Sequence, residues 1–375
     1  MPIIDPADVA LLDPGALLRS YVQSQHHFGL QVRKLAQVFD RCDKVLDRSA
    51  LLQVIARPNW HISYSAGQNS EAFRAAMAGA LERVGATFTF FRHGAELPAA
   101  PDAIVLTHHT RGRRRHGWHY KMAYLPFMFH MDRSGYSGWS DFRAVKRAEI
   151  EAQDQDAADA FFARTVPAIL EAGITKHPQG AVPPPEAGDF VFFALQVPND
   201  SVIQLCFEDD YVAAMRRAML AIRRAGETVV VKPHPFGRTP RVMAMLNAVA
   251  QEGVIVTEAS IHALLPRARA VVTANSGVGF EALLHEKPVL CMAQADYGHA
   301  AVELPDSAAA DQTLAAALGT DRRPFARKML MAMMTRHQVD LRSAEAMDRQ
   351  VLRLLSEYIM PPEGSGRRAA AVPPA

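Results

Sequence analysis

Two short polar segments, each directly after an apolar run, carry residue types suited to binding a phosphate. The first has the sequence KPHP at 232–235 and follows the apolar residues 228–231; the second has NSGVGFE at 275–281 and follows 270–273. The apolar runs predict buried strands, and helical spacing follows each segment. In open parallel sheets, ligands bind outside the carboxyl ends of the strands, and the free N–H groups of a helix start suit an anion. The two segments therefore predict a site for a phosphate-bearing ligand, with a nucleotide-sugar as the first hypothesis.

The first segment holds His234 between two prolines, which restrict the backbone and end the strand sharply. An imidazole fixed at the mouth of the sheet can donate a hydrogen bond to a phosphate oxygen or to a departing phosphate. Lys232, at the strand end, adds positive charge. The alternative is a stiff turn that carries a surface histidine without a ligand.

The second segment combines a hydroxyl and two glycines at the expected start of a helix. The hydroxyl of Ser276 and the N–H groups around Gly277 could cradle a phosphate, because glycine allows a close backbone approach. Asn275 belongs to the same expected site. Alternatively, Ser276 is an ordinary N-cap and Gly279 only allows tight packing. Glu281 could accept hydrogen bonds from ribose or sugar hydroxyls, or it could simply favour the positive end of the helix.

The composition indicates a globular protein. The chain has 375 residues, of which 49% are hydrophobic and 21% charged, and its formal net charge is +2. This length favours two domains, and the small net charge argues against a protein that binds nucleic acid electrostatically. The three cysteines lie far apart and predict buried thiols in a reducing compartment, and the histidines lack a metal-site spacing.

No signal peptide and no apolar run of about 18–20 residues is visible, so we expect a cytoplasmic protein. The sequence is also compatible with a protein that contacts the inner membrane peripherally.

Apolar runs and helical patterns alternate through the second half. Strands are expected over 190–196, 228–231, 254–257, 270–273 and 288–292, and helices over 209–224, 241–251, 261–267 and 279–285. Strands alternating with helices indicate parallel βαβ units in a doubly wound sheet. The first half is less regular but similar, with strands expected over 51–55, 87–91, 103–107 and 121–129 and helices over 70–84 and 154–171.

A segment rich in proline and glycine, 176–188, is expected to be an extended linker. It separates an N-terminal acceptor-side domain, 1–180, from a C-terminal nucleotide-sugar-binding domain, 189–340. A helix over 341–360 could pack back across both halves, and residues 361–375 have too little to bury to be ordered. The expected fold class is therefore α/β, with two Rossmann-like doubly wound domains facing a cleft.

The first half offers two further candidate sites. A polar and aromatic loop at 130–141 could form the wall of a sugar site, with Asp132 as general base or sugar ligand. A solvated or turn-capping aspartate is the alternative. A basic run at 111–121 could meet an anionic acceptor or a phospholipid headgroup, or it could be a solvated loop. No nucleic-acid-binding motif accompanies it.

Four segments in fixed order give the second half a resemblance to a known family. They are LQVPNDS at 195–201, KPHP at 232–235, NSGVGFEALL at 275–284 and KPV at 287–289. In this order they resemble the capsule polysaccharide biosynthesis proteins, a family that includes bacterial Kdo transferases acting on capsule lipid anchors. The resemblance covers about 190–297.

The resemblance implies a GT-B glycosyltransferase whose C-terminal domain holds a nucleotide-sugar donor, most simply a CMP-sugar such as CMP-Kdo. It implies that His234 and Ser276 contact the donor phosphate, and that no metal or other cofactor is needed. The acceptor would be a glycan or a glycolipid. Two alternatives stay open: a transferase that uses a CDP-linked glycerophosphate or polyol phosphate, and a non-catalytic partner in capsule assembly or export. The second is favoured by the lack of a recognisable acidic catalytic motif.

Overall fold

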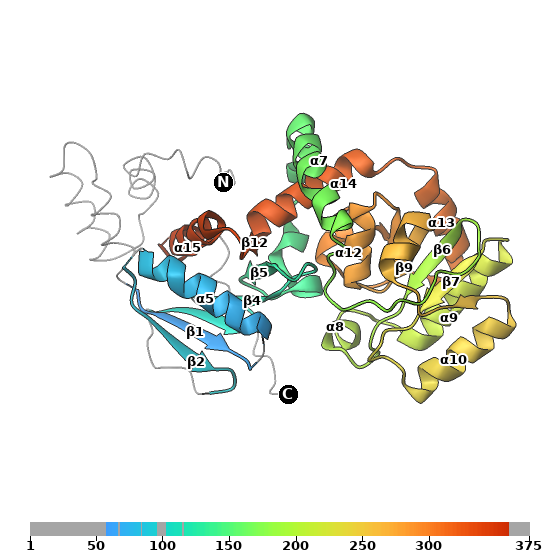
Figure 1. The fold of residues 1–375 in the computed structure, drawn as a ribbon, viewed down its shortest axis with the longest axis horizontal. Helices are drawn as coiled ribbons and strands as arrows, with labels where there is room; N and C mark the ends of the chain where they lie inside the picture. The colour runs from blue at the N-terminus through green and yellow to red at the C-terminus, as the bar shows by residue number, and fades with distance from the viewer. Residues whose placement is uncertain (1–57, 67, 84, 96–102, 115, 360–375) are drawn as a thin grey trace. The chain divides into compact units, whose positions relative to one another are not determined.

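The computed structural model of the chain describes residues 58–66, 68–83, 85–95, 103–114 and 116–359 (Figure 1). Backbone contacts divide the chain into two compact units. Residues 1–121, 129–133 and 338–375 form the first unit, and residues 122–128 and 134–337 form the second. The strand expected over 51–55 and the tail expected over 361–375 lie outside the described residues.

The second unit, which holds both polar segments, is built on a six-stranded sheet, sheet B, with the order β11-β10-β9-β6-β7-β8. Its strands are β6 (Phe190–Ala194), β7 (Val229–Lys232), β8 (Ile255–Val256), β9 (Ala268–Thr273), β10 (Val289–Cys291) and β11 (Val302–Glu303). Every neighbouring pair in sheet B is parallel. The chain runs from β6 through β7 to β8 on one side and then crosses to β9 on the other. The topological switch point therefore lies between β6 and β9.

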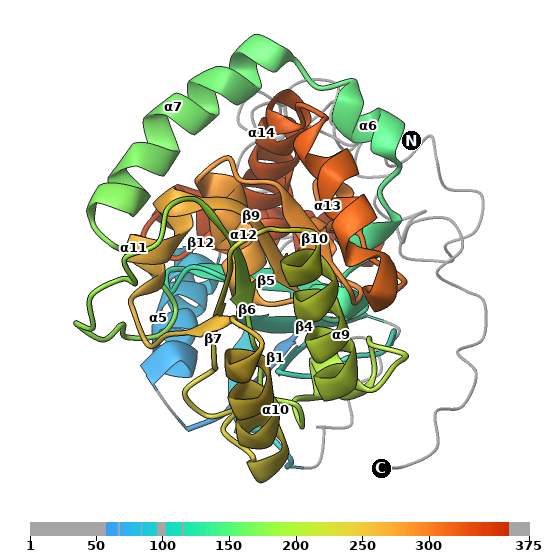
Figure 2. The same cartoon turned by 90° about the vertical axis from the view of Figure 1, so that its right-hand side faces the viewer.

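Helices cover both faces of sheet B (Figure 2). On one face, α9 (Tyr211–Arg224), α10 (Pro240–Gln251) and α13 (Ala310–Leu318) pack with Val191 and Phe193 of β6. On the other face, α7 (Gln155–Glu171), α12 (Gly277–Leu284) and α14 (Arg323–Ala332) pack with Phe190 and Phe192. Shorter helices are α6 (Arg147–Glu151), α8 (Ser201–Gln204) and α11 (Ile261–Leu264). Because β6 is buried on both faces, its sequence is a continuous apolar run.

The first unit is built on a second six-stranded sheet, sheet A, with the order β12-β5-β4-β3-β1-β2. Its strands are β1 (Trp60–Tyr64), β2 (Phe88–Arg92), β3 (Ile104–His108), β4 (Gly117–Met122), β5 (Met128–Asp132) and β12 (Gln338–Asp340). β1 pairs in parallel with β2 on one side and with β3 on the other, and β3 pairs in parallel with β4. The switch point of sheet A therefore lies between β1 and β3.

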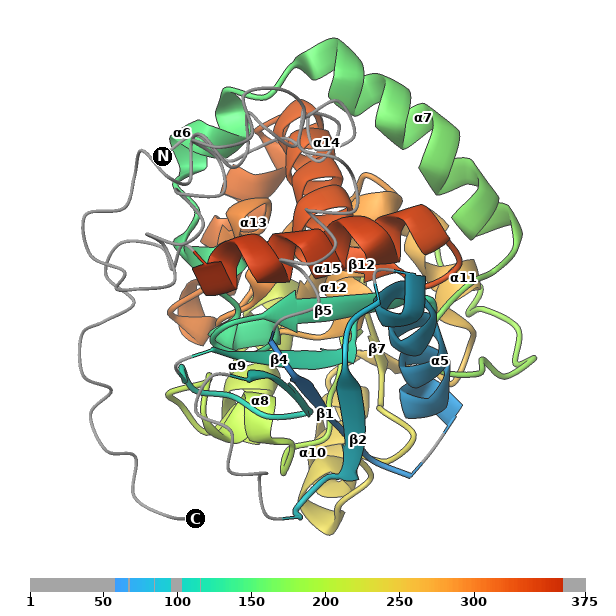
Figure 3. The same ribbon diagram turned by 90° about the vertical axis from the view of Figure 1, so that its left-hand side faces the viewer.

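Helices α5 (Gln68–Arg83) and α15 (Ala344–Ile359) lie side by side against sheet A (Figure 3). A salt bridge of 2.7 Å joins Arg83 of α5 to Asp348 of α15. The helix expected near the C-terminus therefore packs within the first unit, and the short strand β12 before it completes the edge of sheet A.

One expected strand was wrong. Residues 121–129 form the end of β4, a tight turn and the start of β5, because Pro126 occupies the second position of a turn closed by a hydrogen bond from Met128 N–H to Leu125 O at 3.0 Å. β4 and β5 are neighbours joined by only five residues, so they run in opposite directions.

The expected fold class, α/β with two Rossmann-like sheets, is confirmed. The chain passes between its units at 121–122, 128–129, 133–134 and 337–338, whereas we expected a linker at 176–188. The reason is that α7 packs on α14: Asp159 accepts from Arg327 at 3.0 Å, and Gln155 donates to Pro324 O at 3.4 Å. The proline-rich segment after α7 thus lies inside the second unit.

Candidate functional site

Both polar segments lie at the carboxyl edge of sheet B. KPHP follows β7 and NSGVGFE follows β9, and these strands flank β6 on its two sides. Their ends are therefore two strand spacings apart, about 10 Å. The helix α12 begins at Gly277 directly after the second segment, so its N-terminal N–H groups lie at the same edge. A ligand that touches both turns must span the switch point.

Buried hydrogen bonds hold the switch point together. The side-chain amide of Gln196 donates to Asn275 Oδ1 at 2.9 Å, and Gln196 Oε1 accepts from the Asn275 backbone N–H at 2.9 Å. Asn275 Nδ2 in turn donates to Val202 O and Gln294 O, both at 3.0 Å. Both donors of the Asn275 amide are thus engaged inside the protein. Its geometry suits a residue that positions the turn after β9 more than one that contacts a ligand.

Ser276 is the N-cap of α12. Its Oγ accepts from Val278 N–H at 3.2 Å, and its carbonyl accepts from the Tyr297 hydroxyl at 2.6 Å. The hydroxyl is half-buried and still has its own hydrogen to donate. The capping alternative for Ser276 is therefore realised, and it leaves room for a contact with a ligand.

The two glycines of this segment are explained by aromatic neighbours. A Cβ at Gly277 would lie 3.0 Å from Cδ1 of Tyr124, and a Cβ at Gly279 would lie 2.4 Å from the hydroxyl of Tyr297. Tyr124 and Tyr297 are buried, and their rings lie edge to face with centroids 5.5 Å apart. The glycines therefore admit two tyrosines beneath the start of α12.

His234 lies in the turn after β7 with a defined ring orientation. Its Nδ1 accepts from the Phe236 backbone N–H at 3.1 Å, so the neutral imidazole carries its proton on Nε2. Burial, followed by the nearby His177, lowers the pKa of His234. The ring is thus a neutral N–H donor at pH 7, aimed away from its own turn.

A short extended segment, residues 175–179, crosses these turns; we call it the strap. Every second residue of the strap meets one of the predicted site residues. Thr175 donates to Glu281 at 3.0 Å, the His177 ring lies edge-on to His234 with centroids 5.6 Å apart, and Gln179 accepts from Lys232 at 2.9 Å. The strap therefore brings Lys232, His234 and Glu281 into one contiguous group.

The strap also adds positive charge. Burial lowers the pKa of Lys176, and the carboxylate of Asp200, in the turn after β6, opposes this effect. Burial and Lys176 together lower the pKa of His177. Lys232 Nζ donates to Ala259 O at 2.6 Å as well as to the strap, and burial lowers its pKa too. Burial thus disfavours the protonated forms of Lys176, His177 and Lys232. A bound anion would favour these forms again and raise the three pKa values.

Glu281 is buried in the second turn of α12. Burial raises the pKa of its carboxyl to about 8. The hydrogen bond from Thr175 acts in the opposite direction and lowers the pKa, but its effect is smaller. At pH 7 it is therefore predominantly a neutral acid, able to donate a hydrogen bond as well as to accept one. A neutral carboxyl can still accept hydrogen bonds from ribose or sugar hydroxyls, whereas it carries no charge to favour the positive end of the helix.

Replacing Glu281 with glutamine is expected to remove a pH-dependent loss of stability. Between its usual pKa of 4.5 and about 8, the folded protein holds a proton that the unfolded chain has released, so a rise in pH favours unfolding. Urea unfolding should show wild type losing stability relative to Glu281→Gln by up to about 1.4 kcal/mol per pH unit in this window. A difference that does not vary with pH would contradict the buried neutral carboxyl.

Asp132 lies in the first unit, at the end of β5, and is buried. Because β5 runs opposite to β4, the end of β5 lies at the amino edge of the parallel strands. The neighbouring Arg133 confirms this placement, since its guanidinium lies 4.5 Å from the ring centre of Trp118 at the start of β4. The structure therefore places Asp132 at the opposite edge of sheet A from the one where doubly wound sheets bind ligands.

The two other candidate sites of the first half, the loop at 130–141 and the basic run at 111–121, match their predictions only in part. The loop at 130–141 belongs partly to the first unit and partly to the second, and Gly138 packs so closely on Cys206 that a Cβ would lie 2.6 Å from Sγ. In the basic run at 111–121, Trp118 and His119 are buried, whereas 111–114 are exposed. Only the exposed part matches the loop that the sequence suggested.

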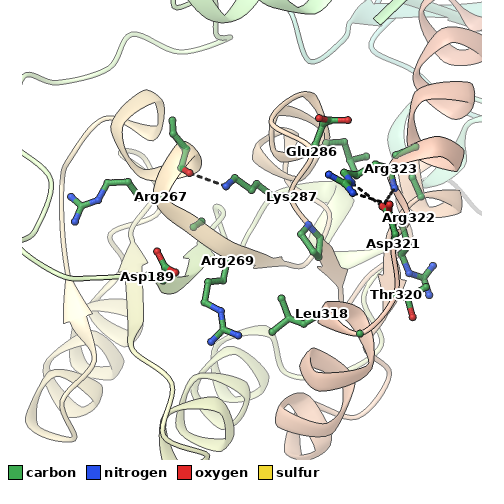
Figure 4. Close-up of a pocket in the computed structure, with 17 residues that line it drawn as sticks. Asp189, Arg267, Arg269, Glu286, Lys287, Leu318, Thr320, Asp321, Arg322 and Arg323 are labelled. Atoms are coloured by element: carbon green, nitrogen blue, oxygen red, sulfur yellow. Dashed lines mark hydrogen bonds and ion pairs between the residues drawn. The ribbon is translucent and has the colours of Figure 1, made fainter. Parts of the chain in front are cut away.

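A hollow of about 470 Å³ lies at the amino edge of sheet B, away from both motifs (Figure 4). Several of its charged residues already have partners: Lys287 donates to Pro266 O at 2.8 Å, and Arg323 pairs with Asp321 at 2.9 Å. Ligands of doubly wound sheets bind at the other edge. We therefore assign this hollow no part in the site.

Sequence reasoning missed the strap residues Thr175, Lys176, His177 and Gln179. The available signal was a proline with a polar side chain on either side, in a segment that we predicted to be a linker.

Among the helices that the structure describes, none has the length and apolar character needed to cross a bilayer. Within the same residues, no group of three or more His, Cys, Asp or Glu side chains could hold a metal ion.

Comparison with known proteins bears on the second unit above all. Among solved structures, the chain is similar to the Thermosulfurimonas dismutans KpsC beta Kdo 2,7 transferase, with 13% identity, a TM-score of 0.49 and coverage of 80% of this chain and 99% of that one. It is also similar to the Methanocaldococcus jannaschii UDP-GlcNAc 2-epimerase in complex with UDP-GlcNAc and UDP, with 9% identity, a TM-score of 0.36 and coverage of 79% and 99%. No curated protein matches the chain in sequence.

A protein-family model matches part of the chain. Residues 171–341 match the model described as capsule polysaccharide biosynthesis protein. The matched range starts at the end of α7, so it contains the strap as well as the segments at 195–201, 232–235 and 275–284. Residues 171–341 are therefore similar to the capsule polysaccharide biosynthesis protein family.

Proposed function

We propose that the protein is a glycosyltransferase of capsule or other surface-polysaccharide assembly, whose second unit binds a nucleotide-sugar donor at the carboxyl edge of sheet B. The observation that carries the proposal is the convergence of His234, His177 and Lys232 with the start of α12 at the switch point. Imidazole N–H groups, an ammonium and a helix start are all donors to a phosphate.

The proposed chemistry is electrostatic. As the bond from the sugar to the donor phosphate breaks, negative charge grows on the phosphate that leaves. His234 donates its Nε2–H to that phosphate. From the other side of β6, the hydroxyl of Ser276 and the N–H groups of α12 donate hydrogen bonds to the same phosphate. Fixed donors of this kind stabilise the charge that develops in the transition state. The proposal includes no metal ion and no other cofactor.

The finer assignments are proposals as well. The sequence resemblance to Kdo transferases within the matched family makes a CMP-linked sugar acid such as CMP-Kdo the first donor to test. The acceptor is a glycan or a glycolipid taken by the first unit, in the cytoplasm and in peripheral contact with the inner membrane. Asp132 is not given the role of general base, because it lies at the opposite edge of sheet A.

The proposal is tested by titrating the intact protein with CMP, CDP, UDP and GDP in a calorimeter. We expect one nucleotide to bind at micromolar to millimolar concentration, and to raise the melting temperature because it binds the folded state. Transfer from the matching sugar nucleotide would then identify the donor. Binding of none of the four would contradict the proposed function and leave a non-catalytic assembly partner.

A change at His177 is expected to weaken nucleotide binding less than a change at His234. Its ring meets His234 edge-on, so it can offer a second neutral donor to the same phosphate. A hydrogen bond to a charged phosphate contributes about 1.5–3 kcal/mol, and we expect His177→Ala to lie at the lower end of this range, at about tenfold in affinity. His177→Gln keeps a donor and should recover part of that loss. Equal affinities in all three proteins would exclude the strap from the site.

A further inference from the structure

The carboxyl edge of sheet A carries a row of polar side chains that the proposed donor site does not use. β2, β1, β3 and β4 are parallel neighbours, so the residues at their carboxyl ends lie in a row. In this order the residues are His93, Ser65, His108 and Lys121, with His108 one residue before the level of the other three, and we call them the basic row. Its centre is the switch point between β1 and β3, where a doubly wound sheet binds its ligand.

Short contacts fix the centre of the basic row. Ser65 Oγ lies 2.7 Å from His108 Nδ1, and the His108 backbone N–H donates to Ser63 Oγ at 2.7 Å. His93 is tied to the same strand end, since its N–H donates to Tyr64 O at 2.6 Å. The contact with Ser65 therefore fixes the orientation of the His108 ring through Nδ1.

His109 extends the basic row toward β4. Its Nε2 lies 2.9 Å from Lys121 Nζ. Its backbone is left-handed, with φ of 54°, which is uncommon for a residue with a side chain and is found more often at functional sites. Helix α5 begins at Gln68, three residues after Ser65, so its N-terminal N–H groups lie at this edge as well.

The charges that act on the His108 ring are positive, whereas the first turn of α5 carries the exposed Glu71. Burial, then His93 and Lys121, lowers the pKa of His108 to about 4. From α5, the Arg74 guanidinium lies 4.2 Å from the ring centre of Tyr64, one residue before Ser65.

Two further titratable rings lie near His108: Tyr120, with its ring centre 4.9 Å away, and His109, with its ring centre 6.0 Å away. Burial raises the pKa of Tyr120 to about 12, so its hydroxyl stays neutral. The described residues that follow β1, β2 and β3 directly, 65–66, 93–95 and 109–114, contain basic but no acidic side chains.

We propose that the basic row, together with His109, binds an anionic group, a carboxylate or a phosphate, on the substrate taken by the first unit. Calling that substrate the sugar acceptor rests on the proposed function above, whereas the binding of an anion does not. The ammonium of Lys121 and the imidazole N–H groups supply charge-assisted and neutral hydrogen bonds. An anion beside His108 favours the imidazolium form, so binding takes up a proton and strengthens as the pH falls.

The test follows the histidine ring signals of the intact protein by NMR, with sulfate as the probe for phosphate and glucuronate as the probe for carboxylate. Sulfate keeps its charge through the pH range used, about 4 to 8. The His108 signals are identified by their loss in His108→Gln. We expect at least one of the two anions to raise the pKa of His108 by about one unit or more, and to bind about fivefold more tightly at pH 4 than at pH 8. The anion with the larger effect identifies the chemical class.

Three controls make the result decisive. His285, in the second unit, also has its pKa lowered to about 4 by burial, and it should not respond. His234→Ala should leave the response of His108 unchanged, which separates this site from the donor site. Lys121→Met should raise the pKa of His108 in the free protein and weaken anion binding, an effect that a purely structural lysine would not have. If neither anion moves His108, or if His285 moves equally, the proposal is overturned.

Discussion

Replacing His234 with alanine is expected to lower nucleotide affinity by about 10- to 100-fold while the protein stays folded. A hydrogen bond to a charged group contributes about 1.5–3 kcal/mol, which corresponds to this range. The ring lies in a proline-bounded turn and is half-buried, so its removal leaves sheet B and its helices intact. The measurement is calorimetric titration with the nucleotide that wild type binds, together with the melting temperature of each protein.

The matched control for this change is His285→Gln. His285 follows α12, a helix that starts at the carboxyl edge of sheet B and therefore ends at the other edge. It is a partly buried histidine of the same unit, and burial lowers its pKa as it does for His234. Its replacement should leave affinity within about twofold of wild type. An unchanged affinity in His234→Ala would mean that the nucleotide binds elsewhere.

Replacing Gly279 with alanine is expected to destabilise the second unit severely. A Cβ there would lie 2.4 Å from the hydroxyl oxygen and 2.8 Å from Cζ of Tyr297, a fully buried ring. Alanine would otherwise favour the helix by about 0.5–1 kcal/mol. Overpacking costs about 1–3 kcal/mol, and the hydrogen bond from Tyr297 to Ser276 O would be strained as well. The clash should therefore prevail and lower the melting temperature by roughly 4–10 °C.

Gly298→Ala is the control for this change, because nothing lies within 4 Å of the Cβ that it would add. It should change the melting temperature by less than about 2 °C. Combining Gly279→Ala with Tyr297→Phe should cost less than the sum of the two single changes, because residues in contact do not act independently. A stable Gly279→Ala protein would show that Tyr297 does not hold the start of α12.

The alternation of strands and helices in the second unit could be predicted because each element carries its own periodic signal. All of β6 and the segments 229–231 of β7 and 270–272 of β9 are buried on both faces, so each is a continuous apolar run, and α9 shows its core face at helical spacing. The order of the turns along the sheet edge follows from parallel βαβ units. The positions of His234 and Ser276 could therefore be derived from sequence patterns.

The strap could not be predicted, because its role depends on contacts between distant residues. Thr175 and Glu281 are separated by 106 positions, and Gln179 and Lys232 by 53. Proline and glycine after α7 indicate only that the helix ends. Whether such a segment spans two domains or folds over one sheet is decided by the packing of α7 on α14, and no local pattern reports this.

The first unit shows a second reason for failure. Gly117–Asp132 contains two strands and a five-residue turn, and a continuous apolar stretch hid the reversal of the chain. The reversal moves Asp132 to the far edge of sheet A. His108, which no motif distinguishes, lies at the switch point through the pairing of β1 with β3. Its site depends on strand order, which a single sequence does not encode locally.

The central claim is that a nucleotide phosphate is bound by His234 and His177 at the switch point of sheet B. Histidine pKa values measured by NMR, with and without the nucleotide that binds, test it most directly. Burial holds both pKa values below the usual 6.5 in the free protein, and an adjacent phosphate should raise both, with the larger rise at His234. A nucleotide that binds and leaves both pKa values unchanged would contradict the account.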